Sequence, residues 1–178
     1  MTGGERRSTN NMDMFQLIKT RRSIRKYTEK NVDDETINKI IEAGTWAPSG
    51  LNNQPWRFAV IKDDELKKKI AALTHYSKVV LSANVLIAVF LDNASSYDRT
   101  KDVQAIGACI QNMLLCIHSR GLGAVWLGEI LKNRESVLSI VDGPADYELM
   151  AVIALGYPAS QGGKGSRNKS AQSVFFRQ

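Results

Sequence analysis

The sequence predicts a single α+β domain in which helices flank a central mixed or antiparallel sheet. Segments with a helical period of apolar residues alternate with short runs rich in β-branched residues. No linker divides the chain before Pro158, and a length of 178 residues suits one hydrophobic core. We expect residues 13–178 to form this domain, with residues 1–12 as a flexible extension and residues 159–178 as a C-terminal arm.

The first half of the chain predicts three helices, two strands and a polar loop. Acidic residues precede the apolar stripe of the second helix, and a proline ends that helix and opens the loop. The expected elements are helices over 13–20, 34–47 and 65–73, a polar loop over 48–55, and strands over 56–61 and 85–91.

The second half is dominated by a long apolar helix, from Val103 to Ile117, that we expect to lie at the centre of the fold. Glycines at 121 and 123 end it. A strand over 124–127, a helix over 134–141 and a strand over 149–155 follow, and residues 173–176 suit one last strand. The apolar residues of that arm either dock on a second subunit or fold back on the chain's own sheet.

Composition places the chain among ordinary globular proteins, with 43% hydrophobic and 24% charged residues. No apolar run reaches the roughly 18 residues that span a bilayer, and residues 1–12 lack the apolar segment of a secretory signal. We therefore expect a cytoplasmic protein. Cys109 and Cys116, two helical turns apart, cannot bridge each other and are expected in the core, and no spacing suggests a metal site.

Basic residues account for the net charge of +6 and gather in two separate segments. The first holds Arg21, Arg22, Ser23 and Arg25, where a helix ends, and the second holds Arg167 and Lys169. Arginine's donor fork suits phosphate oxygens. Two short clusters favour one small phosphate over nucleic acid, although a solvated basic turn and a salt-dependent nucleic-acid binder are the competing interpretations.

Two further segments have the residue types that a flat heteroaromatic ligand requires. The loop with Pro48, Ser49, Asn52 and Gln54 offers hydroxyl and amide groups that match the mixed edge of a pyrimidine ring, or else forms a simple turn. The glycines of residues 121–128 do not fit a dinucleotide fingerprint, because they follow a helix instead of a strand. Glycine at 128 would permit a ligand to approach the backbone closely.

Taken in order, the segments RRSIRKY, APSGLNNQPWRF, GLGAVWLGE and ALGYPA with a basic tail resemble the FMN-dependent nitroreductase family, whose members are NAD(P)H:FMN oxidoreductase-like. The resemblance spans Phe15 to about Phe176. Each motif is modest alone, but four in this order and spacing are specific.

This resemblance implies a sandwich-like α+β fold that forms a homodimer through the long central helix, with two FMN sites at the subunit interface. Positions that match the family's phosphate and ribityl segment are Arg21, Arg22, Ser23 and Arg25, and those that match its C-terminal phosphate clamp are Arg167 and Lys169. Pro48, Ser49, Asn52 and Gln54 match the loop around the flavin ring, commonly supplied by the other subunit, and Leu127, Gly128 and Glu129 match the turn whose backbone amide faces flavin N5.

The activity that the resemblance implies is reduction of nitroaromatics, quinones or similar small electrophiles by NAD(P)H through FMN, in ping-pong two-electron transfer. No catalytic side chain is expected, because the backbone of Gly128 and Glu129 acts near N5. A flavin-binding module without turnover and a specialised relative, either a dehalogenase or a flavin-consuming enzyme, are the alternatives.

Two features depart from the family pattern. The chain is short and lacks helical insertions over the substrate pocket, which predicts an open site. Tyr76, Ser77 and Lys78 occupy the region where some members supply an Asn and a Lys to the flavin, so no flavin contact is predicted there. The lid motif of iodotyrosine-deiodinase-like relatives is also absent from the sequence.

Overall fold

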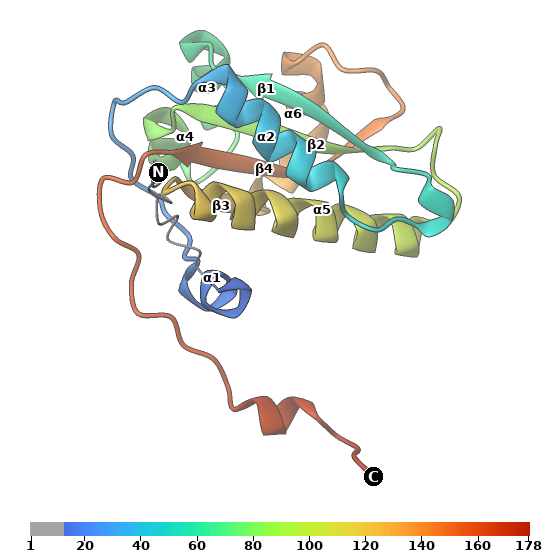
Figure 1. The fold of residues 1–178 in the computed structure, drawn as a ribbon. Coiled ribbons are helices and arrows are strands. Elements are labelled where there is room, and N and C mark those ends of the chain that lie inside the picture. The colour runs from blue at the N-terminus through green and yellow to red at the C-terminus, as the bar shows by residue number, and fades with distance from the viewer. Residues whose placement is uncertain (1–12) are drawn as a thin grey trace, which may run out of the picture.

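The computed structural model describes residues 13–178, so the flexible extension predicted for residues 1–12 lies outside the described residues. One four-stranded sheet forms the centre of the molecule (Figure 1). Its strands are β1 (Trp56–Ile61), β2 (Val85–Asp92), β3 (Gly123–Leu127) and β4 (Tyr147–Gly156), in the order β1-β2-β4-β3. Each neighbouring pair of strands is antiparallel, so the sheet is antiparallel and not mixed, one of the two types that the sequence predicted.

Helices cover both faces of this sheet and so form a three-layer sandwich. The helices α2 (Asp34–Thr45) and α5 (Arg99–Ser119) pack on one face, and α3 (Asp64–Ala71), α4 (Ser77–Ser82) and α6 (Arg134–Ile140) pack on the other. A short helix, α1 (Met14–Thr20), lies beside the end of α5 (Figure 1). Three 3-10 helices complete the described chain: η1 (Gly50–Asn52), η2 (Glu129–Asn133) and η3 (Ser170–Ser173).

Strand β2 shows why the chain needs both helical layers. All of its residues are buried, although alternate side chains point to opposite faces of the sheet. Ile87 and Val89 join the core with α2 and α5, whereas Leu86 and Phe90 join the core with α3, α4 and α6. Full burial of such a side chain stabilises the fold by about 1.5–3 kcal/mol. An apolar strand without alternation therefore specifies a sheet covered on both faces.

The central helix α5 packs closely against α2. A Cβ added at Gly44 of α2 would lie 2.7 Å from Cγ of Met113 and 3.0 Å from Sγ of Cys109, so this crossing requires glycine. Cys109 is fully buried, and burial raises the pKa of its thiol to about 12. Cys116 is partly buried against the same core and is also a free cysteine. Cys109 thus occupies the core position expected of it, whereas Cys116 lies at the edge of the core.

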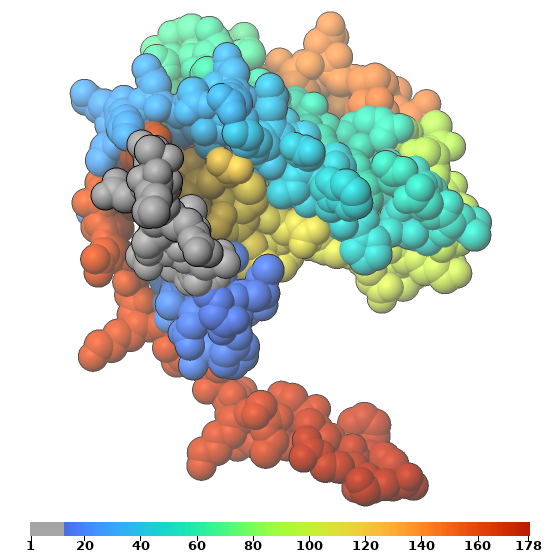
Figure 2. Space-filling model, viewed as in Figure 1, coloured from blue at the N-terminus to red at the C-terminus, as the bar shows by residue number. Residues whose placement is uncertain are grey.

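The largest difference from the predicted elements concerns the C-terminal arm. No strand forms over residues 173–176, and the arm does not fold back on the chain's own sheet. The last part of the arm, around η3 and the C-terminus, stands clear of the body (Figure 2), where Phe175 is fully exposed, Phe176 67% exposed and Val174 44% exposed. The helix α4 was not predicted either, because it is only one and a half turns long and rich in valine.

No helix within residues 13–178 is long and apolar enough to cross a membrane.

Candidate functional site

The first basic segment leaves α1 and runs along the edge of β3. Arg21 ends the helix with extended backbone angles, and Ser23 then forms a parallel bridge to Ala124. The N–H of Ile24 donates to the carbonyl of Ala124 at 2.9 Å. This edge position presents Ser23 and Arg25 to solvent, while Arg21 is half-buried.

Arg22 holds the start of the C-terminal arm against this segment. Its Nε donates to the carbonyl of Gly163 at 3.0 Å, and its Nη1 donates to the carbonyls of Lys19 and Arg21 at 2.7 and 2.9 Å. A Cβ added at Gly165 would lie 2.5 Å from the guanidinium carbon, so glycine lets the arm pass. Only the Nη2 donors of Arg22 remain for a ligand.

The structure brings the two basic segments together, as their spacing in the chain could not show. The pKa of Arg21 is lowered by burial and then by the neighbouring positive charges of Arg167 and Arg22. Within residues 13–178, no carboxylate forms an ion pair with these arginines or with Arg25. Gathered like charges oppose one another, so this cluster favours an anionic ligand. Lys169 is exposed further along the arm, where it precedes η3.

Beside these arginines lies a cleft of about 1120 Å³ between α1, the end of α5, the start of β3 and the residues after β4. Arg21, Arg22 and His118 are among its lining residues. Nε2 of His118 lies 2.9 Å from Oγ1 of Thr20. Burial, together with the charges of Arg21 and Arg22, lowers the pKa of His118, which keeps the imidazole neutral and adds no further cation.

The loop with the predicted ring-binding residues adopts a left-handed backbone at several positions. The φ angles of Leu51, Asn52 and Gln54 are 53°, 54° and 47°, values that cost non-glycine residues energy and that cluster at binding sites. Oγ of Ser49 accepts from the N–H of Gln54 at 3.0 Å, so this hydroxyl closes the loop. Pro48, Asn52 and Gln54 are exposed at the surface.

Asn53, which the sequence analysis passed over, anchors this loop. Its Nδ2 donates to the carboxylate of Asp102 at 2.8 Å and to the carbonyl of Ser95 at 3.1 Å. Asp102 is fully buried and also accepts from Oγ of Ser96 at 2.6 Å and from the N–H of Tyr97 at 3.1 Å. Burial alone would raise the pKa of Asp102, but these hydrogen bonds lower it. The sequence shows only an acidic residue in the first turn of a helix, which is typical of a surface position.

The third predicted group is the turn from Leu127 to Glu129. Leu127 and Ile130 are buried on either side of it. The backbone of Gly128 has an ordinary φ of −97°, and an added Cβ would meet nothing within 4 Å. Neither backbone conformation nor packing within residues 13–178 therefore requires glycine here. Open space above the backbone fits the close approach of a flat ligand.

One chain does not bring all of these residues to one place. The ring loop is tied to Asp102 at the start of α5, whereas the basic cluster lies beside His118 at its end. These positions are about 24 Å apart at a helical rise of about 1.5 Å per residue. The structure thus assembles the Arg21, Arg22 and Arg167 cluster within one chain and leaves Pro48, Ser49, Asn52 and Gln54 at the other end of the helix.

Comparison with known proteins gives a consistent family. The family model described as the nitroreductase family matches residues 18–77 and 71–157. Arg167 and Lys169 lie outside the matched residues. A protein of Methanothermobacter thermautotrophicus with the provisional name NADH dehydrogenase/NAD(P)H nitroreductase is 40% identical over 154 residues, which cover 85% of this chain and 81% of the relative.

Two further proteins extend this comparison. The crystal structure of a provisionally named nitroreductase from Desulfovibrio desulfuricans in complex with FMN has a TM-score of 0.88 and 48% identity, and covers 92% of this chain and 96% of that one. The iodotyrosine deiodinase of Thermotoga neapolitana is 25% identical over 181 residues, which cover 88% of this chain and 94% of the relative.

Proposed function

The chain belongs to the nitroreductase family, and from this premise we propose that it is an FMN-dependent oxidoreductase that uses NAD(P)H to reduce nitroaromatics, quinones or similar small electrophiles. FMN, when bound, supplies hydride transfer, with donor and acceptor using one site in turn in a ping-pong cycle. The observation that carries the proposal is that Arg22 holds the arm against the first basic segment, through the 3.0 Å hydrogen bond from its Nε to the carbonyl of Gly163. Cations from distant segments, Arg21 and Arg167, therefore lie near one another without a carboxylate partner in residues 13–178. The negative charge of a phosphate monoester offsets the positive charge of such a cluster.

In this proposal the phosphate and ribityl chain are bound by the basic segments. The residues that we assign to this part are Arg21, Arg22, Ser23, Arg25, Arg167 and Lys169. Arg22 contributes through Nη2, because its other donors already bind backbone carbonyls. Leu127, Gly128 and Glu129 supply backbone to the ring. Preorganised N–H donors lower the energy of charge that develops during transfer without reorganising first.

The proposal includes a homodimer in which Pro48, Ser49, Asn52 and Gln54 of one chain reach the ring held by the other. Support comes from the distance that separates this loop from the basic cluster in a single chain. Exposed apolar residues support it as well, since Trp46 is 81% and Leu51 86% exposed beside this loop. Such large exposed side chains are typical of interaction surfaces. The exposed arm docks on the second subunit in the same assembly.

The setting that we propose is the cytoplasm, which the two free cysteines support weakly because disulfides are rare there. The iodotyrosine deiodinase relative supports reductive dehalogenation as a second candidate within the same flavin chemistry. A halogenated phenol offered as the acceptor distinguishes the two, since a dehalogenase releases halide in proportion to the donor consumed.

The visible absorbance spectrum of the purified protein tests the proposal first, followed by anaerobic addition of NADH and of NADPH. We expect flavin bands that bleach with at least one donor, and steady-state lines that run parallel when both substrates are varied. Flavin bands that no donor bleaches would indicate a binding module without turnover. A colourless protein that does not take up added FMN, and that binds nucleic acid with steep salt dependence, would refute the proposal.

A further inference from the structure

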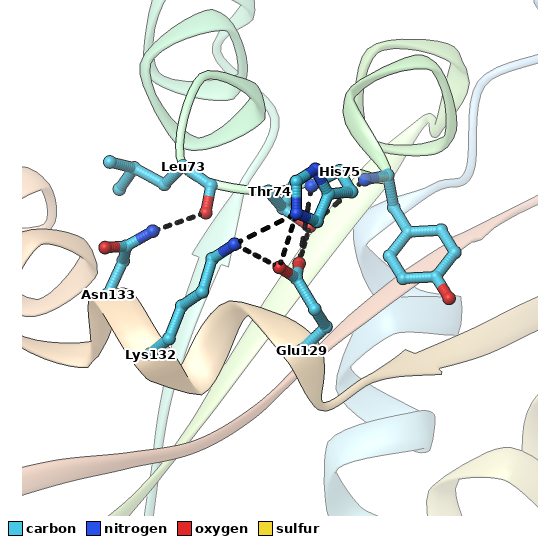
Figure 3. A network of polar contacts seen from close by, with 7 residues as sticks. Leu73, Thr74, His75, Glu129, Lys132 and Asn133 are labelled. Carbon is cyan, nitrogen blue, oxygen red and sulfur yellow. Dashed lines mark hydrogen bonds and ion pairs between the residues drawn. The ribbon is translucent and has the colours of Figure 1, made fainter.

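A network of polar contacts holds Glu129 from two sides (Figure 3). Its Oε2 accepts from Oγ1 of Thr74 at 2.7 Å and from the N–H of His75 at 3.3 Å. Its Oε1 forms an ion pair with Nζ of Lys132, one turn further along η2. The carboxylate is therefore fixed between its own helix and the residues that join α3 to α4.

The surroundings of Thr74 determine where its hydroxyl donates its proton. The side chain is buried, and Oγ1 accepts from the N–H of Tyr76 at 3.2 Å. Because the ionised carboxylate of Glu129 can only accept and the N–H of Tyr76 can only donate, the hydroxyl's own proton points to Glu129. A second link supports the same junction, since Nδ2 of Asn133 donates to the carbonyl of Leu73 at 2.7 Å (Figure 3).

These contacts show that the Glu129 side chain acts as an anchor. Hydrogen bonds from Lys132 and Thr74, and then from the backbone of His75, lower the pKa of the carboxyl to about 2. Such a group stays ionised near neutral pH and has no proton to give. What it does is tie the turn that contains Gly128 to the opposite segment, while the buried side chains of Leu127 and Ile130 hold the turn from below.

We infer that Thr74 and Lys132 are positioning residues: by holding the Glu129 carboxylate from two sides, they fix the peptide between Gly128 and Glu129 that faces the reducible edge of the bound ring. This inference rests on the proposed function. A hydrogen-bond donor helps a reaction most when supporting residues lock its geometry in advance. The segment after α3 thus acts on the ring through Glu129.

The test compares wild-type protein with Thr74→Val, which is isosteric but lacks the hydroxyl, and Lys132→Met, which removes the ammonium from a half-exposed side chain. We expect both to bind FMN with affinity close to wild type. The rate of flavin reduction at saturating NADH or NADPH should fall roughly 10- to 100-fold, because a small misplacement of the backbone N–H that faces the ring can cause a loss of this size. The visible absorption maxima of the bound flavin should shift as well.

Two control variants separate positioning from general destabilisation. Thr74→Ser keeps the hydroxyl and should restore the rate. Lys67→Met removes another bond that joins α3 to the end of α4, because Nζ of Lys67 donates to the carbonyl of Ala83 at 3.1 Å and pairs with Asp64 at 2.8 Å. It does not touch Glu129, so it should lower stability and leave the flavin spectrum and rate unchanged.

The outcomes for this inference and for the proposed function are distinct. A wild-type protein without flavin reduction refutes both. An active wild-type enzyme whose Thr74→Val and Lys132→Met variants keep its rate and spectrum refutes the inference alone. The same holds if Lys67→Met slows flavin reduction as much as these variants do, since destabilisation would then explain the loss. Slow reduction with shifted maxima in both variants, and rescue by Thr74→Ser, supports the inference.

Discussion

The side-chain amide of Asn53 donates to the carboxylate of Asp102 across 2.8 Å, and this hydrogen bond joins the loop before β1 to the first turn of α5. Gly50 of the same loop lies against the hydroxyl end of Tyr97, where a Cβ would overlap the phenol oxygen. The segment between β2 and α5 therefore supports the whole loop. A loop with left-handed residues keeps its shape when such partners hold it.

Replacing Asp102 with Asn should lower the free energy of unfolding by about 1–3 kcal/mol. The new amide nitrogen cannot accept the donors that now surround this buried carboxylate, which leaves polar groups unsatisfied. Denaturant unfolding measures the change. Asp34→Asn is the control, because among residues 13–178 this exposed carboxylate pairs with Lys62 alone, and its loss should cost less than about 0.5 kcal/mol. Equal losses in both variants would contradict a special role for Asp102.

Replacing Arg25 or Arg167 with Ala should weaken FMN binding roughly 10- to 100-fold, the loss expected for one charge-assisted hydrogen bond to phosphate. Flavin fluorescence during titration measures the affinity. Lys39→Ala also removes one positive charge, from an exposed ion pair on α2, and should leave the affinity unchanged. If all three variants weaken binding alike, net charge and not a defined phosphate site is responsible.

Replacing Gly128 with Ala should leave the protein without FMN as stable as wild type, or slightly more stable. The backbone angles suit alanine and the added methyl meets no atom within 4 Å. FMN affinity should nevertheless fall, because the methyl occupies space that we assign to the ring. Thermal unfolding with and without FMN measures both effects. Unchanged FMN affinity would show that the ring does not approach this backbone.

Replacing Gly107 with Leu should convert the homodimer that we propose to monomers and release FMN. This glycine lies in the middle of α5, and its missing side chain leaves open space in a single chain. A helical glycine exposed to water costs about 1 kcal/mol relative to alanine, so close approach of a second chain gives a reason for it. Sedimentation measures the mass, with Lys69→Leu on the exposed face of α3 as control. A Gly107→Leu protein that stays dimeric would place the interface elsewhere.

Because of the Glu129 anchor, the free energy of unfolding should fall with pH between the ordinary pKa of 4.5 and about 2. The pKa of this carboxyl falls from an ordinary 4.5 to about 2 on folding, so its contribution is complete above the ordinary value and is lost as the pH falls toward about 2. Wild type should therefore unfold at higher denaturant than Glu129→Gln at pH 7, and the difference should narrow below pH 4.5. A difference that is constant over this range would contradict the assignment.

Periodicity and local chemistry were sufficient for most of the elements. The predicted strand over 56–61 coincides with β1, and the acidic start and proline stop of α2 were each readable from neighbouring residues. The helix α4 could not be predicted in this way, because its six residues with adjacent valines show no helical pattern of their own. The predicted strand over 173–176 was wrong, because these residues find no neighbouring strand to pair with in this chain.

Family membership and the residue types of the site follow from the order of short motifs along the chain, since each motif is a local pattern. The meeting of Arg21 with Arg167, the anchor from Asp102 to Asn53 and the hold of Thr74 and Lys132 on Glu129 depend on the packing of elements. Most of these partners lie far apart in sequence, and side-chain polarity alone does not reveal which ones will meet. Only the three-layer packing of helices on the sheet makes these segments neighbours, because burial of apolar faces decides which loops come together.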